Sequence, residues 1–295
     1  MIVVKVTGGI GNQLFQYSFG KCIAAQYGTR LKFDVQTNYN FSGFTSRPFL
    51  LEDLQLDILI AKNEEIQNFR YFKSGLLSRL ERKLICFFPF LNKHYIVQNL
   101  YQPCDSGTRY GDNCYYDGYW QSEKYFKAIE NELKQDLQTK LQSRLDKSNI
   151  SHLNEIENQA SISLHIRRGD YISIESNKGM FSTCSLEYYE KAMNYFKNEI
   201  SSPVFFIFSD DINWARSNFK GEQFRFVDNN SQSPEIDLFL MSKCKHNIIA
   251  NSSFSWWGAW LNTNINKIVI APKKWFKNKM SDKDLIPDNW LRIDN

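Results

Sequence analysis

Two adjacent arginines, Arg167 and Arg168, directly follow a run of apolar residues with the pattern of a strand, 161–166. A guanidinium is costly to bury unless an anion meets it, and its fixed fork of donors matches phosphate oxygens in pairs. His165 could donate a hydrogen bond to the same oxygens, and Asp170 could orient one guanidinium. The pattern therefore predicts a phosphate-binding site, and the alternative is a structural Arg–Asp pair at the end of a strand.

A second polar run, at residues 251–253, stands between an apolar strand-like segment and an aromatic helix-like segment that opens with Phe254. The N–H groups at a helix N-terminus, together with serine hydroxyls, readily bind phosphate. We therefore expect Asn251, Ser252, Ser253 and Phe254 to contact the same anion. Simple capping of the helix by one of the serines would be compatible with this role.

Two adjacent acids, Asp210 and Asp211, follow the strand-like run 204–208. Paired carboxylates suggest a metal site, but this pair has no spacer residue and no evident third ligand. A carboxylate here could instead accept hydrogen bonds from the N1–H and the exocyclic amine of a guanine, and we expect Asp210 to do so. For Asp211, capping of the next helix is the alternative. We expect no metal ion and no other cofactor.

A glycine-rich turn at residues 8–11 follows the β-branched run 2–6 and opens a helix-like segment. As a dinucleotide fingerprint it fails, because the position that requires the last glycine holds Leu14. The turn and the start of the helix could still place amide donors against a sugar or a diphosphate. We expect these donors to come from Gly9, Gly11, Asn12 and Gln13.

The spacing of apolar residues indicates which elements position these motifs. Residues 1–35 read as strand, turn, helix and strand, and the second half alternates strand-like and helix-like runs. This alternation predicts an α/β fold with parallel, doubly wound sheets, in which the polar motifs fall at the carboxyl ends of strands. We expect an N-terminal domain over 1–150 and a C-terminal domain over 151–295, with a linker at 146–159. The strand-like runs of the second half are 161–166, 204–208, 224–227, 247–250 and 267–270.

Composition limits the class of protein. The 295 residues are 42% hydrophobic and 15% aromatic, which suits a packed core and is too apolar for disorder. A formal charge of +4 is far from that of a duplex-binding protein but suits a phosphorylated small ligand. The six cysteines are scattered without a CxxC pair, which favours reduced thiols. No apolar run could span a bilayer and no signal peptide opens the chain, so we expect a cytoplasmic protein of a bacterium-like cell.

Residues 69–84 interleave basic and apolar side chains, with Glu81 as the only acid. A basic amphipathic helix of this kind could lie on an anionic membrane surface, which would make the protein peripheral to the inner membrane. The alternative is a solvated helix packed on the N-terminal domain. Residues 36–115 otherwise carry no motif.

Four motifs, taken in order, are similar to those of the α-1,2-fucosyltransferases, glycosyltransferase family 11, of the bacterial type. They lie at residues 8–17, 165–170, 208–211 and 237–261. The resemblance implies a GT-B architecture, in which two Rossmann-like, doubly wound domains face a cleft. It places the acceptor on the N-terminal side and GDP-fucose on the C-terminal side, and the last helix could pack back on the N-terminal domain.

The resemblance also implies a reaction and the residues that perform it. The reaction is inverting, metal-independent transfer of L-fucose from GDP-β-L-fucose to the 2-hydroxyl of a terminal β-galactoside, in oligosaccharide or O-antigen biosynthesis. Asp210 would face guanine, and Asn12 would approach the transferring sugar and the acceptor hydroxyl. The base stays open between Asp170 and Glu175, which lies near the place where similar α-1,6 enzymes use a glutamate. The side chains implied to contact the diphosphate are His165, Arg167, Arg168, Ser252 and Ser253.

Other functions stay open at this point. The arginines would recognise a diphosphate and the carboxylate a guanine, so the chain could form another linkage or use another GDP-deoxysugar. It could also be a catalytically silent sugar-nucleotide or carbohydrate-binding module. A nicotinamide oxidoreductase is disfavoured by the failed fingerprint. Nucleic acid is not expected as a partner, and no motif specifies the acceptor or the oligomeric state.

Overall fold

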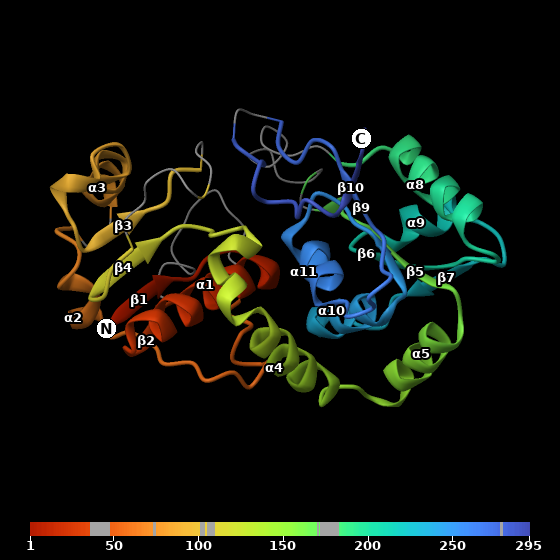
Figure 1. Cartoon of the computed structure of the whole chain (residues 1–295), viewed down its shortest axis with the longest axis horizontal. Helices are drawn as coiled ribbons and strands as arrows, with labels where there is room; N and C mark the ends of the chain where they lie inside the picture. The colour runs from red at the N-terminus through yellow and green to blue at the C-terminus, as the bar shows by residue number, and fades with distance from the viewer. Residues whose placement is uncertain are drawn as a thin grey trace. The chain divides into compact units, whose positions relative to one another are not determined.

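The computed structural model describes residues 1–35, 48–72, 75–100, 104, 110–169, 171, 183–277 and 280–295. The chain forms two compact units, which are coloured in chain order in Figure 1. Unit 1 comprises Met1–Leu133 with Lys283–Leu285, and unit 2 comprises Lys134–Asp282 with Ile286–Asn295. The division falls inside helix α4 (Glu130–Gln142), whereas the sequence suggests a division after residue 150.

Unit 1 is built on a parallel sheet of four strands in the order β2-β1-β4-β3. Strand β1 (Ile2–Lys5) is wholly buried because β2 (Leu31–Asp34) and β4 (Cys114–Asp117) pair with it on either side. Strand β3 (Tyr95–Val97) completes the sheet beside β4. Helix α1 (Ile10–Tyr27) connects β1 to β2, so the predicted strand, turn, helix and strand are confirmed.

Helix α1 ends at a glycine for a steric reason. Gly28 has φ +59°, in the left-handed region, and its N–H reaches the carbonyl oxygens of Ala24 and Ala25. Glycine adopts this conformation without the penalty that a Cβ would bring, and the cap satisfies carbonyls that the helix leaves open. The chain is thereby turned back into β2.

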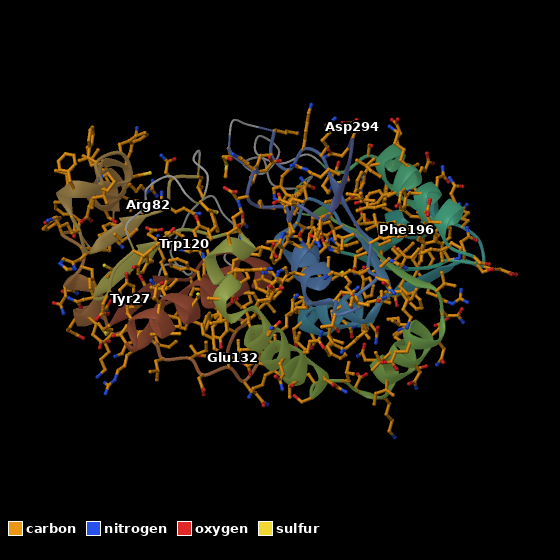
Figure 2. All side chains as sticks on the ribbon, viewed as in Figure 1. Tyr27, Arg82, Trp120, Glu132, Phe196 and Asp294 are labelled. Carbon is orange, nitrogen blue, oxygen red and sulfur yellow. The ribbon has the colours of Figure 1, made fainter. Side chains whose placement is uncertain are left out.

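The described part of the crossover from β2 to β3 contains α2 (Asn63–Gln67), α3 (Gly75–Phe87) and the 3₁₀ turn η2 (Pro89–Leu91). Helix α3 is fastened to the sheet by Arg82, which is labelled in Figure 2. Arg82 Nε lies 3.1 Å from Asp117 Oδ2, at the carboxyl end of β4. Lys5 Nζ lies 3.2 Å from the same oxygen, and the Tyr95 hydroxyl donates to it over 3.0 Å.

Asp117 is ionised in this buried place because of its cationic neighbours. Burial alone would raise the pKa of its carboxyl, but the charges of Lys5 and Arg82 and the hydrogen bonds from Tyr95 and Lys5 lower that pKa to about 2. A buried carboxylate is stable only where it is paired and hydrogen-bonded in this way. The cluster therefore joins β1, β3, β4 and α3 at one point of unit 1.

The remaining core of unit 1 is aromatic. Phe19 of α1 stacks on Trp120, labelled in Figure 2, with 4.1 Å between ring centroids. Trp120 is fully buried, and three tyrosines meet it edge-on, each at a large interplanar angle. Edge-to-face contacts of this kind are favoured by the quadrupoles of the rings. The three tyrosines are Tyr110, Tyr116 and Tyr125.

Unit 2 is built on a parallel sheet of six strands in the order β10-β9-β8-β5-β6-β7. The chain starts with β5 in the middle, adds two strands on one side and then returns to add three on the other. The order therefore reverses between β5 and β8. In chain order the strands are β5 (Ser161–Ile166), β6 (Val204–Ser209), β7 (Phe224–Val227), β8 (His246–Ile248), β9 (Val269–Pro272) and β10 (Leu291–Ile293).

The helices of unit 2 begin where side chains cap them. Ser185 accepts from the backbone N–H of Tyr188 at the start of α8, and Asp211 accepts from that of Trp214 at the start of α9. In α10 a proline, Pro234, occupies the first turn. The helices are α5 (Lys147–Asn158), α8 (Leu186–Glu199), α9 (Ile212–Asn218), α10 (Pro234–Lys243) and α11 (Ser253–Leu261).

The expectation of a linker at residues 146–159 is wrong, because this segment contains helix α5. Asp146 caps it by accepting from the N–H of Asn149, and Asn149 and Ile156 are buried against the rest of the unit. The tryptophans of α11 belong to the core, since Trp256, Trp257 and Trp260 are all buried.

An α/β chain with two parallel, doubly wound sheets was predicted, and this prediction is confirmed. Two successive Rossmann-like units are the arrangement that a GT-B protein requires, while the cleft between them stays a prediction. Within the residues described above, no helix has the length and apolar character needed to cross a membrane. The six cysteines, all of them described, are free thiols.

Candidate functional site

The three predicted motifs of unit 2 meet at one edge of its sheet. Because β5, β6 and β8 are parallel neighbours, their carboxyl ends lie together, and each leads into one motif. The point where the strand order reverses, between β5 and β8, is where open α/β sheets bind their ligands. Arg167 and Arg168 leave β5 at this point. We call this edge the switch-point site.

Each arginine after β5 is paired with an acid after β6. Arg167 Nη1 lies 3.1 Å from Asp210 Oδ2, and Arg168 Nε lies 3.3 Å from Asp211 Oδ2. The guanidinium of Arg168 also lies 4.2 Å from the ring centroid of Trp214, a cation–π distance. The two side chains are 23% and 20% exposed, so both are largely withdrawn from water. The structural pair and the anion site are compatible, because a guanidinium carries five N–H donors.

Asp210 holds the backbone of the basic loop as well as a side chain. Its Oδ1 accepts a hydrogen bond from the N–H of Arg168 over 2.8 Å. A Cβ at Gly169 would lie only 3.0 Å from Asp210 Oδ2, so a glycine permits this close approach. Sequence reasoning assigned Asp210 to guanine and missed this positioning role. The guanine contact stays a prediction, while Asp211 caps α9 as its alternative reading proposed.

His165 lies beneath the arginines as a neutral imidazole. It is buried in β5, with its ring centroid 5.4 Å from that of Phe254. Burial and the nearby charge of Arg167 lower its pKa to about 3. Its Nδ1 has no hydrogen-bond partner among the described residues. Buried polar atoms are almost always satisfied in folded proteins, so a bound ligand is a reasonable partner for this one.

The run after β8 is anchored by its own backbone and side chains. Ser252 caps α11, since its hydroxyl accepts from the N–H of Phe254 over 3.3 Å. Asn251 is fully buried and donates to the carbonyl of Trp275 over 3.1 Å. Ser253 and Phe254 are half-buried at the first turn of α11. Ser252 therefore caps the helix, as the alternative proposed. Asn251 holds the run after β8 against the segment that contains Trp275.

Tyr171 connects the two motifs and was missed by sequence reasoning. Its hydroxyl donates to the carbonyl oxygen of Asn251 over 2.8 Å, and its ring centroid lies 5.8 Å from the guanidinium of Arg167. A tyrosine following a charged run carries no sequence signal of its own, because its partners come from β5 and β8 only after the sheet has formed.

The glycine-rich motif lies in unit 1 and is held by amide side chains. Gly8 has φ +82°, and a Cβ there would lie 2.5 Å from Nδ2 of Asn12, so only glycine fits. Asn12 Oδ1 accepts from the amide of Gln121 over 2.8 Å. Gly9 is the N-cap of α1, a Cβ on it would meet no atom within 4 Å, and Gly11 is buried in the first turn.

Gln13 has a structural role that the sequence analysis did not assign to it. Its side chain is fully buried. The amide nitrogen donates to the carbonyl oxygens of Gly8 and Pro48, over 2.9 and 2.8 Å, and the amide oxygen accepts from the N–H of Leu50 over 2.9 Å. Both donors and the acceptor are thus engaged with the backbone, and we leave Gln13 out of the proposed donor site.

Two predicted residues, Asp170 and Glu175, lie outside the described residues. Over the part of the chain that is described, no three histidine, cysteine, aspartate or glutamate side chains are grouped as metal ligands.

The sheet order defines a doubly wound α/β protein, a class that binds its ligands at the switch point, and the basic loop lies at that point. The family can be stated as well. The model of glycosyl transferase family 11 matches residues 1–294, and the chain belongs to that family. The resemblance drawn from the four motifs is therefore confirmed, and the family is one of transferases.

Three relatives illustrate the range of this similarity. The chain is 33% identical over 304 residues to an alpha-1,2-colitosyltransferase of Escherichia coli, covering 100% of this chain and 99% of that protein. It is 47% identical over 139 residues to the O-antigen biosynthesis glycosyltransferase WbnK of Escherichia coli, covering 46% of each. It is 34% identical over 103 residues to the galactoside 2-alpha-L-fucosyltransferase Sec1 of Mus musculus, covering 34% of this chain and 28% of that protein.

The depressed pKa of His165 predicts a specific acid sensitivity. The folded-state pKa of about 3 lies below the value of roughly 6.5 expected in the unfolded chain, so between the two only the unfolded state takes up the proton. Stability is complete above about pH 6.5 and falls as the pH drops, by about 1.4 kcal/mol per pH unit for this one group. Urea unfolding of the wild type and of His165→Gln, between about pH 7 and pH 5, measures the difference in slope.

The matched control for this measurement is Asn154→Gln, on α5 of the same unit, which changes an exposed side chain without a titratable group and should keep the wild-type slope. The slope is compared rather than the absolute stability, so a general loss in the His165 variant does not obscure the result. Equal slopes for the wild type and His165→Gln would refute the assignment.

Proposed function

We propose that the chain transfers L-fucose from GDP-β-L-fucose to the 2-hydroxyl of a terminal β-galactoside, with inversion and without a metal ion. The observation that carries the proposal is the switch-point site, where two ordered guanidiniums and a neutral imidazole with an unsatisfied nitrogen surround one sheet edge. Family membership and the activities for which the relatives are named support a glycosyl donor, an α-1,2 linkage and an oligosaccharide acceptor such as an O-antigen unit.

In the proposed reaction the bond between fucose C1 and the β-phosphate oxygen breaks while the galactoside oxygen bonds to C1. Negative charge grows on the departing GDP, and the ring becomes oxocarbenium-like. Arg167 and Arg168 interact more strongly with this charge in the transition state than with the bound donor, which is the condition for a faster reaction. Asp210 and Asp211 hold the two arginines in place before the donor arrives, so little reorganisation is needed.

The remaining assignments complete the proposal. The C-terminal domain binds the donor through the switch-point site, with Asp210 turned to guanine and the amides at Ser252 and Ser253 to the phosphates. The N-terminal domain receives the acceptor, with Asn12 close to the transferring sugar. The enzyme works in the cytoplasm with no resident cofactor. The proton of the acceptor hydroxyl passes to a carboxylate, Asp170 or Glu175.

We expect Arg167→Ala and Arg168→Ala each to lower kcat by about a hundredfold or more, the scale of removing one fixed stabiliser of a developing charge. The measurement is GDP release in the presence of a β-galactoside, with far-ultraviolet circular dichroism to show that each variant is folded. Arg216→Ala is the matched control, because Arg216 is also paired with an acid in unit 2, Asp228. If both folded variants turned over at the wild-type rate, Arg167 and Arg168 would not stabilise the charge on the leaving group.

If Glu175 is the general base, Glu175→Gln should lower kcat by about a hundredfold to ten-thousandfold and remove the acidic limb of the pH–rate profile. The control is Glu187→Gln, an exposed glutamate on α8 that pairs only with Lys191 in the described interactions. If the Glu175 variant kept the wild-type pH–rate profile, Glu175 would not be the general base, and Asp170 would be assigned that role.

A second donor is favoured by the full-length similarity to a colitosyltransferase. Colitose is fucose without its 3-hydroxyl, and a site that hydrogen-bonds this hydroxyl rejects the analogue by about four orders of magnitude. We expect kcat/KM for GDP-fucose to exceed that for GDP-colitose by such a factor. A higher kcat/KM for GDP-colitose would make the chain a colitosyltransferase. It would leave the proposed role of Arg167 and Arg168 unchanged.

The product of the same assay is analysed for its linkage, with and without EDTA. An α-1,2-linked product formed at an undiminished rate in EDTA is expected. Complete loss of transfer in EDTA would contradict the metal-independent mechanism.

A further inference from the structure

Helix α3 faces unit 1 mainly with polar side chains, and Ile85 is the apolar side chain of the helix that is buried there. Ser78 accepts a hydrogen bond from buried Arg70, and Glu81 accepts from the N–H groups of Tyr71 and Phe72, over 2.7 and 3.3 Å. Arg82 pairs with Asp117 at the end of β4. Ser78 precedes Glu81 by three residues and Arg82 by four, so these side chains lie on one side of the helix. Amphipathic helices normally pack their apolar stripe inward, so α3 is inverted.

The outward side of α3 is therefore apolar. Leu76 is 81% exposed, and the leucines and the phenylalanine that follow it at helical spacing are also exposed. The stripe continues into η2, where Phe90 is 72% exposed. Side chains standing out from α3 into open space can be seen in Figure 2. The exposed apolar residues, together called the α3 face, are Leu76, Leu77, Leu80, Leu84, Phe87, Phe88, Phe90 and Leu91.

Within the segment 69–94, the exposed charges beside the α3 face are of one sign. Arg79, Lys83 and Lys93 are exposed beside it. From residue 69 to residue 94 the sequence holds one acid, Glu81, and this carboxylate is buried and engaged with the backbone. Exposed leucine and phenylalanine flanked by lysine and arginine, with no exposed acid, complement a surface that is apolar within and anionic at its boundary.

We propose that the α3 face is a docking surface for an anionic lipid bilayer, in which the leucines and phenylalanines enter the acyl boundary and Lys83, Lys93 and Arg79 meet lipid phosphates. A second copy of the chain fits less well, because a two-fold contact through this face would bring its cations against their own counterparts. The proposal extends the surface beyond the basic segment 69–84 to η2 and assigns the contact to the outward side of the helix. It stands independently of the proposed transfer reaction.

The test is co-sedimentation of the full chain with vesicles of phosphatidylcholine alone or with about one third phosphatidylglycerol. Wild type should pellet with the anionic vesicles, and raising the salt to about 0.5 M should release it, since screening acts on the charged part of the contact. Leu76→Gln/Leu80→Gln/Leu84→Gln should weaken binding by at least about tenfold. Lys83→Glu/Lys93→Glu should weaken it by about fivefold or more for each residue.

Two matched controls distinguish a local surface from general stickiness. Ile150→Gln/Ile265→Gln removes exposed apolar side chains from unit 2, and Lys197→Glu/Lys220→Glu reverses exposed charges there. Both should bind vesicles as the wild type does, and thermal unfolding shows that every variant is folded. The proposal is overturned if the wild type ignores anionic vesicles or if the α3 variants bind like the controls. It is also overturned if the leucine variant abolishes only a concentration-dependent dimer measured by sedimentation velocity.

Discussion

The arrangement of unit 2 depends on two arginine–aspartate pairs across the ends of β5 and β6. Adjacent guanidiniums repel each other and lose hydration where a strand leaves the core, so neither could stay at this depth alone. The parallel register brings Ile166 opposite Ser209, and the chain then continues into the arginines on one strand and the acids on the other. The sheet thus supplies the counter-charges that the basic loop needs.

The pairing has a direct energetic meaning for any anion that arrives. In a loose loop, the side chains and the backbone would lose conformational entropy at the moment of binding. Here Asp210 holds one guanidinium and the N–H of the next residue, and Tyr171 ties the loop to the run after β8. The conformational entropy of these residues is therefore lost when the protein folds, before any anion binds. Unit 1 uses the same device around Asp117, where the counter-charges come from β1 and α3.

Much of this could be predicted from sequence, because the relevant signals are local. Apolar runs bounded by polar residues identified β5 to β9 of unit 2 but missed the short strand β10, and Asp211 marked the start of α9. The motif positions then followed from the rule that parallel strands share a carboxyl edge. Helix α5 was missed because its long polar stretches dilute the apolar period, and its buried contacts, at Asn149 and Ile156, are few.

Other features are set by distant partners and leave no local trace. The sequence around Gln13 does not distinguish an amide that binds a sugar from one that supports the backbone. Its structural role becomes visible only through its hydrogen bonds with the backbone of Pro48 and Leu50. The period of residues 75–87 identifies an amphipathic helix but not which side faces inward. That choice is made by Asp117, which lies on another element, and by the N–H groups of residues 71 and 72, which come just before the helix.

The inverted attachment of α3 has a consequence for its freedom to rotate. Apolar packing is non-directional, so a helix held by leucines can roll about its axis by some degrees and still bury similar area. A helix held by an ion pair and by hydrogen bonds cannot roll, because these contacts weaken steeply once their angles open. Arg82 and Glu81 therefore fix the rotation of α3 about its own axis. The exposed apolar side chains of the helix consequently project from unit 1 in one direction.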